Sequence, residues 1–498
     1  MRCLTIIAFV YILRDAGAYG KTRRSEILEQ ETRLAVGGNT NLTEQEDAVN
    51  NCLMQAKFRE CDYGFTNPQY FNFSHHYFSY MEIIKHSKVY RMIKDIPKGA
   101  ALHVHDMAML SPDYLLNVTY MDYLYVCFEQ NTVKLRFSKA APKDTCAIKW
   151  QLMKNARKHS GDIEKFDEKL RKHFTLVCDH PDETYPTIKE SWDTFLGYFG
   201  TVAPMLSYRP VWEQYFYDAL KAFREDNIMY VEVRSVLPDL YELDGTTYDP
   251  VVTAKAYKKS IKRFMKDYPD FLGAKIIYAP SRLVDRQQLG VYLETARRIK
   301  KEVPEIFAGF DLVGPEDQGN PLIEFVPQLE EAGKDLNYFF HAGETDWYGT
   351  LTDDNLVDAI LLGAKRLGHA YALPKHPILM EEVRKRDIGL EVNVISNAVL
   401  SLVRDVRNHP LALFLAQGLP VVLSSDDPGV WEADPLSHDF YVAFVGVASR
   451  LSDLRLLKTL ALNSLKYSAL DGADKINAVD KFSQRWNDFI VNFNCSKY

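Results

Sequence analysis

After its first residues, the sequence has no long apolar run, no Cys-x-x-Cys pair and no strong excess of charge of either sign. A membrane helix needs about 20 apolar residues, so we expect no membrane span. Without Cys-x-x-Cys, a zinc site built from cysteines is not expected. The net charge of −7 over 498 residues is mild. A nucleic-acid-binding protein typically has a basic excess, so we expect no nucleic-acid partner.

The first residues have the pattern of an export signal. Arg2 precedes a short apolar run at residues 3–13, and Ala-Gly-Ala at 16–18 fits a cleavage site between small residues. A buried N-terminal helix or strand is the alternative interpretation. We predict a signal peptide over residues 1–18 and a secreted, extracellular protein.

Two further features agree with export. The acceptor motif for N-glycosylation, Asn-x-Ser or Asn-x-Thr, occurs four times, at Asn41, Asn72, Asn117 and Asn494. Six cysteines remain once Cys3 leaves with the signal, namely Cys52, Cys61, Cys127, Cys146, Cys178 and Cys495. An even number permits disulfides in an oxidising compartment, but the pattern of residues leaves their pairing open.

The composition changes along the first third of the chain. Residues 25–95 are polar with spaced apolar residues, which predicts helices. Residues 134–172 hold twelve Lys or Arg against five Asp or Glu, in a chain whose total charge is negative. This basic stretch is either a solvated helical face or a binding patch, and the pattern favours neither.

From about residue 187 onward, β-rich runs alternate with longer helical stretches. Together with one earlier run there are eight, at 99–106, 228–236, 272–279, 306–314, 336–344, 364–370, 388–396 and 419–427. They are largely apolar, as expected for parallel strands that are buried on both faces. The alternation predicts an α/β fold, a closed parallel (β/α)8 TIM barrel.

Polar residues gather at the carboxyl ends of these runs. They are His103, His105, His341, His369, Asp426 and Asp427. His103 and His105 share one strand face, because residues i and i+2 point the same way. An isolated His-x-His is usually an ordinary strand end. The strand ends of a TIM barrel, however, meet at the face where active sites form, so the repeated position predicts a shared centre.

Four of these side chains form a metal-ligand set. His103, His105, His341 and Asp426 supply three imidazoles and one carboxylate, which suits zinc and leaves room for a water. The run at 306–314 has no lysine that could be carbamylated to bridge two metals. We therefore predict one Zn²⁺ per subunit.

Two further residues at the strand ends can move protons. Zinc lowers the pKa of a bound water towards ~7, which supplies a nucleophile at neutral pH. Glu344, three residues after His341, could give a proton to the substrate. His369 could accept a proton from the nucleophilic water and orient it. An acid and a base beside a metal suit hydrolytic attack on an amidine-like carbon.

Five motifs of the sequence resemble those of the adenosine deaminases. The matching segments are HVHD at 103–106, GFDLVG at 309–314 with Glu-Asp after it, HAGETDW at 341–347, RLGHA at 366–370 and SSDDP at 424–428. HAGETDW, the export signal and the insertion after the first strand are similar to the secreted branch, adenosine deaminase 2 or the adenosine deaminase growth factors. The resemblance covers about residues 30–490.

The resemblance implies a reaction and its machinery. It implies hydrolysis of adenosine, and of 2′-deoxyadenosine, to inosine or its deoxy form and ammonia. The zinc ligands are implied to be those named above. Glu344 would protonate purine N1 and so make C6 electrophilic, and His369 would be the base.

The resemblance also implies how the substrate is held. Asp427 would hydrogen-bond to purine N7, and the backbone of Gly314 would face N3. Asp106, Trp192 and Trp347 match positions around the nucleoside in the secreted branch. For these last three, packing and strand-end capping are the alternative interpretation.

A domain order follows from the same resemblance. It comprises a signal peptide at 1–18, a helical dimerisation region at 19–97, the barrel at 98–116 and 181–490, and a receptor-binding insertion at 117–180. Cys127 and Cys146 match the disulfide of that insertion. We therefore expect a homodimer, and a cell-surface receptor or a sulfated glycan as a partner of the basic insertion.

Two positions depart from the family pattern. Ala370 follows the histidine of the sixth run, where relatives commonly have glycine, and we expect one methyl group to shift the packing only slightly. Ser281 stands where some relatives carry a histidine near the ribose. Affinity for adenosine, or the choice between adenosine and 2′-deoxyadenosine, could differ for this reason.

Two other functions compete with adenosine deamination. A growth factor could keep the barrel and act by surface contact alone, but an abandoned site would usually have lost its acid, its base or a ligand. An AMP deaminase would need a phosphate site, and secretion away from the nucleotide pool argues against it. Both remain as alternatives to the secreted zinc hydrolase.

Overall fold

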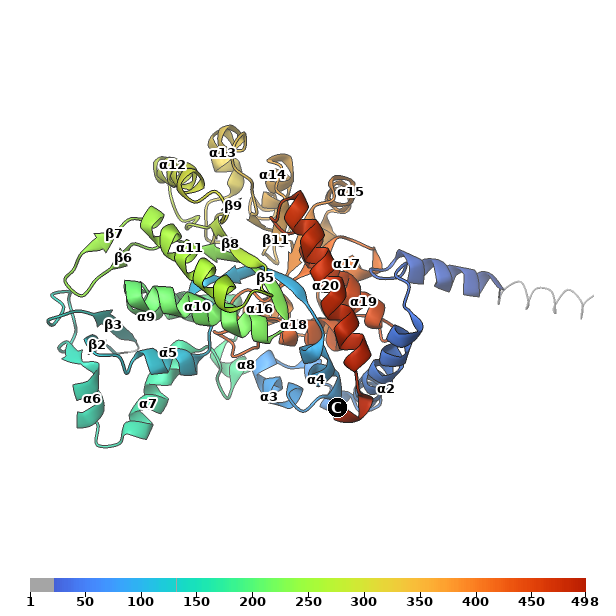
Figure 1. Cartoon of the computed structure of the whole chain (residues 1–498), viewed down its shortest axis with the longest axis horizontal. Coiled ribbons are helices and arrows are strands. Elements are labelled where there is room, and N and C mark those ends of the chain that lie inside the picture. The colour runs from blue at the N-terminus through green and yellow to red at the C-terminus, as the bar shows by residue number, and fades with distance from the viewer. Residues whose placement is uncertain (1–21, 131) are drawn as a thin grey trace, which may run out of the picture.

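The centre of the molecule is a closed barrel of parallel strands surrounded by helices (Figure 1). The computed structural model describes residues 22–130 and 132–498. The predicted signal peptide at 1–18 lies outside the described residues. Within them, no helix is both long enough and apolar enough to cross a membrane.

Two four-stranded parallel sheets form the barrel, in the orders β1-β5-β8-β9 and β10-β11-β12-β13. The strands are β1 (Gly99–His105), β5 (Ile228–Ser235), β8 (Gly273–Tyr278), β9 (Phe307–Phe310), β10 (His341–Ala342), β11 (Arg366–His369), β12 (Gly389–Val392) and β13 (Val421–Leu423). Single bridges, Val104 to Asp426 and Phe310 to Tyr338, join the two sheets. The predicted TIM barrel is confirmed, and every predicted run contains one of its strands.

The fifth strand is much shorter than the predicted run 336–344. Only His341 and Ala342 pair regularly with β11. Further back in this run the carbonyl of Phe339 accepts a hydrogen bond from the Arg234 guanidinium at 2.9 Å. On the side of β11, the carbonyls of Tyr338 and Phe340 accept from Lys365 and Gly368, each at 2.8 Å, so two residues of this run face three of the next and the ladder is irregular there.

One helix follows each strand and packs on the outside of the barrel (Figure 1). In strand order these are α10, which precedes β5, then α11, α12, α13, α14, α15, α17 and α19. Their bounds are α10 (Arg209–Glu225), α11 (Pro250–Asp267), α12 (Arg286–Glu302), α13 (Val326–Ala332), α14 (Asn355–Leu361), α15 (Pro377–Arg386), α17 (Leu411–Ala416) and α19 (Leu454–Lys466). Asp249, Asp285 and Asp453 begin α11, α12 and α19, where each carboxylate accepts a backbone N–H of the first turn.

Further helices lie at the barrel ends. They are α8 (Pro181–Thr184), α9 (Ile188–Leu206), α16 (Val394–Val399), α18 (Ser437–Tyr441) and α20 (Gly472–Asn492). A hairpin of β6 (Leu240–Tyr241) and β7 (Thr247–Tyr248) follows β5. Of these, α9 and α16 place side chains beside the carboxyl ends of the barrel strands.

The residues before the barrel are helical, as predicted. They form α2 (Glu44–Thr66), α3 (Met81–Ile84) and α4 (Lys88–Asp95). A disulfide between Cys52 and Cys495 ties α2 to the end of the chain, which resolves a pairing that the sequence left open. Residues 22–34 form a helix that projects from the body with all of its residues exposed (Figure 1).

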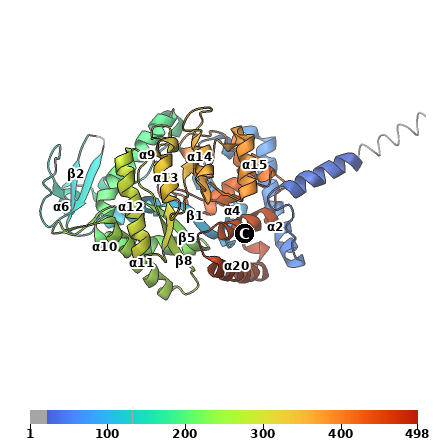
Figure 2. The ribbon, with the colours of Figure 1, turned by 90° about the horizontal axis from the view of Figure 1, so that it is seen from above.

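The insertion after β1 forms a small module of its own. Its elements are α5 (Pro112–Val118), β2 (Leu124–Phe128), β3 (Val133–Phe137), β4 (Gln151–Leu152), α6 (Met153–His159) and α7 (Ile163–Arg171). The three strands pair antiparallel in the order β3-β2-β4. The predicted Cys127–Cys146 disulfide is present. This module and the projecting N-terminal helix lie at opposite ends of the molecule (Figure 2).

Candidate metal centre and active site

The histidines and the aspartate at the strand ends converge on one point. The Nε2 atom of His105 lies 3.1 Å from Oδ1 of Asp426, and Nε2 of His103 lies 3.3 Å from the same oxygen. The Nε2 atoms of His103 and His341 are 3.1 Å apart. Ligand atoms of His103, His341, His369 and Asp426 all lie within 4.8 Å of one another, as do those of His105, Asp426 and Asp427. The structure thus brings together all four predicted ligands.

The hydrogen bonds behind the histidines explain why this group fits a metal. The Nδ1 atom of His103 donates to Glu391 at 2.8 Å, and Nδ1 of His341 donates to Asp311 at 2.7 Å. With their protons on Nδ1, both rings turn the lone pair of Nε2 to the same spot. Burial lowers the pKa of His341 to about 3, so the ring is neutral at pH 7. Lone pairs at such close range repel unless a cation lies between them.

Asp426 completes the donor set as its anion. Burial raises its pKa, but the close imidazoles of His103 and His105 outweigh this and hold the pKa well below its usual range. Its Oδ2 accepts a hydrogen bond from Ser396 of α16 at 2.7 Å. Its Oδ1 has no hydrogen-bond partner of regular geometry, although two imidazoles lie within contact distance. An oxygen left in this way is suited to a metal bond.

Sequence reasoning missed the two carboxylates that hold the histidines. Asp311 follows β9 and Glu391 lies within β12, and both are fully buried. The signal was present, because each is the one acid inside a β-rich run that is largely apolar. A buried acid needs partners, so its presence in such a strand indicates a polar network inside the barrel.

Glu344 is a buried carboxyl group with an unusual environment. Its Oε1 has no hydrogen-bond partner, and its own backbone N–H donates to Glu316 at 2.6 Å. Burial, followed by the charges of Asp426 and Glu316, raises the pKa of Glu344 well above its usual range. The raised pKa favours the protonated form of this group, which lines the cavity beside it.

Asp427 has the same character as Glu344. Its Oδ1 has no partner, and burial together with the adjacent charge of Asp426 raises its pKa well above the usual range. The pKa values of two neighbouring aspartates are thus shifted in opposite directions, because the histidines stabilise the anion of Asp426 while burial and that charge disfavour the anion of Asp427.

His369 is fixed by a chain of hydrogen bonds that begins at the backbone. The N–H of Leu411 donates to Nδ1 of His409 at 3.0 Å, so His409 carries its proton on Nε2 and donates to Oδ1 of Asn397 at 3.0 Å. The amide nitrogen of Asn397 then faces Nδ1 of His369 at 3.1 Å. This favours the proton of His369 on Nε2, 3.7 Å from Oδ2 of Asp426. The side-chain amide of Asn393 also faces Nε2, with its nitrogen at 3.4 Å and its oxygen without a partner, so that amide turned over would accept the proton.

Positive backbone φ angles mark the two strand ends closest to this centre. His369 has φ 62°, Ala370 φ 48° and Asp426 φ 61°. Such angles cost free energy in residues other than glycine, and they cluster at functional sites. Ala370 therefore adopts a conformation that glycine reaches more easily, which gives the family's usual glycine at this position a physical reason.

A cavity with a volume of about 280 Å³ opens above the centre. It is mostly apolar, with Trp192, Phe195, Leu196 and Phe199 of α9 along one side. Its other lining residues include His105, Asp106, Ser281, Gly314, Glu344, His369, Asp426 and Asp427. This size and character fit a small, largely flat organic molecule.

The predicted substrate residues fall into two groups. Asp106, Trp192, Gly314 and Asp427 line the cavity, whereas Trp347 is 65% exposed and is absent from the lining. Gly314 has φ 114°, which a side chain would strain. Burial raises the pKa of Asp106 to about 6, and its carboxylate accepts a hydrogen bond from Tyr257 at 3.1 Å.

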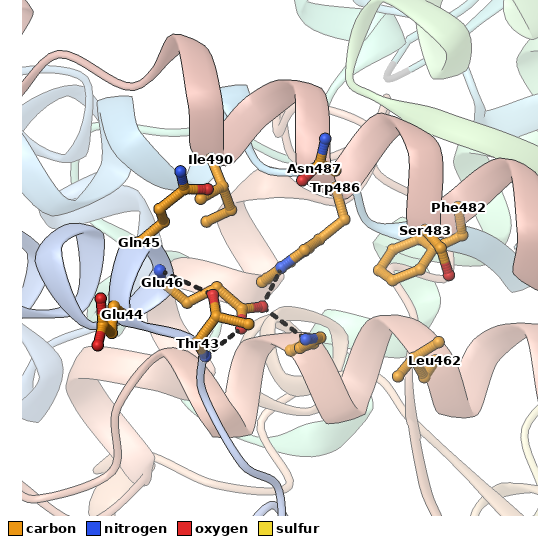
Figure 3. A pocket seen from close by; sticks show the side chains of 11 residues that line it. Thr43, Glu44, Gln45, Glu46, Leu462, Phe482, Ser483, Trp486, Asn487 and Ile490 are labelled. Atoms are coloured by element: carbon orange, nitrogen blue, oxygen red, sulfur yellow. Dashed lines mark hydrogen bonds and ion pairs between the residues drawn. The ribbon is translucent and has the colours of Figure 1, made fainter.

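A second groove lies away from this centre, between the start of α2 and helices α19 and α20 (Figure 3). Its one buried acid, Glu46, is already satisfied. The carboxylate accepts hydrogen bonds from the backbone of Thr43 at 2.8 Å, from Lys458 at 2.5 Å and from the Trp486 indole at 2.6 Å. The groove therefore offers no unpartnered carboxylate comparable with Glu344.

Comparisons with known proteins agree with this centre. A family model described as adenosine deaminase matches residues 171–485, and a second, adenosine/AMP deaminase N-terminal, matches residues 8–93. An adenosine deaminase of Aedes albopictus is 42% identical over 94% of this chain and 87% of its own length. Human adenosine deaminase 2 is 38% identical over 94% of this chain and 93% of its own length. The chain belongs to the adenosine deaminase family. The predicted resemblance is confirmed, and so is the prediction of a deaminase enzyme.

Solved structures support the fold of this family member. An N6-methyl-AMP deaminase from Arabidopsis thaliana aligns with a TM-score of 0.57, at 15% identity, over 80% of this chain and 99% of its own. An adenine deaminase from Arthrobacter aurescens aligns with a TM-score of 0.56, at 19% identity, over 79% of this chain and 99% of its own. At these identities the likeness concerns the barrel alone.

Proposed function

We propose that this member of the adenosine deaminase family is a zinc-dependent hydrolase that converts adenosine, and 2′-deoxyadenosine, to inosine or its deoxy form and ammonia. One observation carries the proposal. A donor set of imidazoles and one carboxylate lies beside Glu344, whose Oε1 has no hydrogen-bond partner, at the floor of a small apolar cavity. The names of the relatives from Aedes albopictus and human support adenosine as the substrate.

In the proposed reaction, His103, His105, His341 and Asp426 hold one zinc ion. When bound, the metal supplies a water activated as a nucleophile near neutral pH. Glu344 gives its proton to purine N1, which makes C6 more electrophilic and moves electron density away from the point of attack. The oxygen of water bonds to C6 and the bond from C6 to the exocyclic nitrogen breaks. One proton of that water leaves with the nitrogen as part of ammonia and the other returns to Glu344, while the proton given by Glu344 stays on N1.

His369 has two proposed parts in this reaction, and its hydrogen bonds bear on the choice. With its proton on Nε2, the ring donates a hydrogen bond towards the nucleophile and orients it. Acceptance of a proton at Nε2 needs the other tautomer, in which Nδ1 carries the proton. We therefore propose orientation as its main part, and the general-base role stays a prediction.

The purine is proposed to be held by neutral donors. Asp427, as a protonated acid, donates to N7, which only accepts hydrogen bonds. The backbone of Gly314 faces N3, and Trp192 packs against the nucleoside. Asp106 is proposed to bind the ribose. Trp347 could contact the nucleoside only if its exposed side chain moved over the cavity, so its role in substrate binding stays a prediction.

AMP is a poorer candidate substrate than adenosine. Among the described residues that line the cavity, Arg234 is the one cationic side chain. Its guanidinium is fully buried and already bonded to Asp311 and Glu391, at 2.8 and 2.6 Å. A phosphate entering this cavity would meet carboxyl groups instead of a free cation. A growth factor without catalysis is also less favoured, since no acid or ligand of the site has been lost.

We further propose that the protein is secreted, glycosylated and homodimeric, with the domain boundaries 1–18, 19–97, 98–116 with 181–490, and 117–180. The two disulfides support an oxidising compartment. The projecting helix 22–34, with exposed Ile27, Leu28 and Leu34, supports pairing of two chains. The insertion is proposed to bind a cell-surface receptor or a sulfated glycan, and growth-factor-like effects would act through it.

Rates on three substrates test the proposal. Purified protein should deaminate adenosine and 2′-deoxyadenosine, followed by the loss of ultraviolet absorbance, and should act far more slowly on AMP. A preference for AMP would favour the second candidate. No turnover of any of the three by zinc-loaded protein would leave only the binding function.

A further inference from the structure

A layer of buried charge fills the barrel interior below the metal centre. It consists of Glu232 and Arg234 from β5, Arg366 from β11, Glu391 from β12 and Asp311 after β9, and each side chain has no measurable exposure. Such a network is costly unless every charge is paired and hydrogen-bonded. Its extent therefore calls for a functional explanation.

The upper half of this layer touches the ligands. Arg234 donates from Nε to Asp311 at 2.8 Å and from Nη2 to Glu391 at 2.6 Å. These two carboxylates in turn accept the Nδ1 protons of His341 and His103, at 2.7 and 2.8 Å. Arg234 thus links the supports of two metal-ligating rings.

The lower half touches no ligand. Arg366 donates from Nε to the second oxygen of Glu391, and from Nη2 to Glu232 at 2.6 Å. The backbone N–H of Ala469, in the turn between α19 and α20, donates to the other oxygen of Glu232. Arg366 also donates to the carbonyl of Tyr467 at 2.9 Å in the same turn. The chain of contacts runs from this turn to His103.

The charges in this chain do not cancel. Among the five fully buried side chains, three carboxylates face two guanidinium groups, which leaves one negative charge in excess. Lys475 of α20 acts on Glu232 and Arg366 from a half-buried position, where water screens its charge more than the charges inside the barrel. Asp426 above adds a second. A divalent cation at the histidines brings the buried group to neutrality, and in a low-dielectric interior that balance has a large effect on cation binding.

We infer that Arg366 and Glu232 are positioning residues for the metal centre, which set its affinity for a divalent cation through Glu391 and His103. The inference rests on the proposed metal site. It distinguishes the two residues by sign: loss of the Glu232 charge weakens metal binding, and loss of the Arg366 charge strengthens it. A purely structural pair would weaken metal binding in both cases.

The test uses the full chain with zinc alone, titrated in competition with a chromophoric chelator. Glu232→Gln should raise the dissociation constant roughly 10-fold or more, the size usual for residues behind metal ligands. Arg366→Gln should lower it. The double variant Glu232→Gln with Arg366→Gln restores the net charge and should return to within about threefold of the parent. Equal weakening by both single variants, or no change in either, overturns the inference.

Matched controls come from a second buried ion pair, Lys98 with Asp226, whose charged atoms lie 3.8 Å apart without contact to the network. Lys98→Gln and Asp226→Asn should leave zinc affinity unchanged, and shifts of the same size there would also overturn the inference. Where a single variant does not fold alone, refolding with and without zinc replaces the titration. Recovery of Arg366→Gln by zinc, but not of Glu232→Gln, supports the inference, and any other pattern of recovery overturns it.

Failure of the proposed metal site would look different. If the proposed metal site is wrong, Asp426→Ala should bind zinc as tightly as the parent, and the proposal of a zinc site would be overturned. Normal loss of zinc in Asp426→Ala, with unchanged affinity in the Glu232 and Arg366 variants, would overturn only this inference.

Discussion

The two ends of the barrel interior treat buried acids in opposite ways. In the lower layer, Glu391 is paired, and although burial raises its pKa, Arg234 and Arg366 hold the pKa well below the usual range. At the upper end, Glu344 and Asp427 have no cationic partner, and burial raises the pKa of each well above the usual range. The pKa values of the same residue types are therefore shifted down below the proposed metal centre and up above it.

This difference separates acids that hold the proposed metal ligands in place from acids that take part in the proposed reaction. Breaking a buried pair by removing one partner costs about 3–5 kcal/mol, so substitutions in the lower layer should destabilise the fold. A buried acid without a partner lowers the free energy of unfolding, and such a residue is retained where function needs it. Substitutions at the upper end should therefore reduce activity while the metal-free protein stays folded.

The largest expected effect is loss of the metal. Asp426→Ala removes the one anionic ligand, and zinc occupancy and adenosine turnover should fall together to background. Metal analysis of the purified variant, beside its activity, checks this. Full occupancy with normal turnover would mean that Asp426 is not a ligand.

Next comes the loss of the acid at the upper end. Glu344→Gln keeps the shape of the side chain but cannot give a proton in the same way. Since general acid catalysis contributes typically ~10²–10⁴-fold, turnover should fall by at least ~10²-fold with zinc content unchanged. Near-parent turnover in this variant would remove Glu344 from the mechanism.

A smaller effect is expected at Asp427, and it distinguishes a neutral acid from an anion. Asp427→Ala removes the proposed donor to N7 and should reduce turnover or substrate binding roughly 10–100-fold, the value of a buried hydrogen bond. Asp427→Asn still offers an N–H donor and should recover most of this loss. Both variants should retain zinc. If Asn is as damaging as Ala, Asp427 acts as an anion instead.

The smallest catalytic effect is expected in the insertion. Arg157 and Arg171 of the basic stretch are structural, since they pair with Asp167 and Asp113 at 2.7 and 2.6 Å. The exposed lysines are better probes. Replacing Lys158, Lys169 and Lys172 with glutamine should bring elution from heparin to a lower salt concentration, because exposed charges are screened within ~8 Å at physiological ionic strength.

The control for this prediction replaces three exposed lysines of α11 and α12 instead, Lys262, Lys266 and Lys301. Adenosine turnover should stay within a few-fold of the parent in both triple variants. Equal elution of the two would make the basic stretch an ordinary solvated face. A collapse of turnover in the first would mean that the insertion supports the active site.

The barrel and the meeting of the strand-end histidines with Asp426 could be predicted because both follow from local patterns. Alternating runs gave the strands, and histidines at their ends gave the centre. The support below it could not be derived in the same way, because the pairing of Arg366 with Glu391 and Glu232 depends on the closure of the barrel. A buried arginine in a strand indicates a partner without identifying it.

The two disulfides also differ in whether the sequence could predict them. Cys127 and Cys146 could be paired through the family resemblance, and they lie 19 residues apart. Cys52 and Cys495 are separated by 443 residues, and only the packing of α2 against the end of the chain brings them together. The hydrogen bonds that fix His369 were likewise out of reach, since Asn397 and His409 become neighbours only through the turn after α16.

One measurement tests the central claim most directly, namely that this barrel uses a metal held by its strand-end histidines to deaminate adenosine. Purified protein would be stripped with a chelator, assayed on adenosine, then reloaded with one equivalent of zinc and assayed again. The account predicts that turnover disappears on stripping and returns with about one zinc per chain. Full turnover by metal-free protein would contradict it.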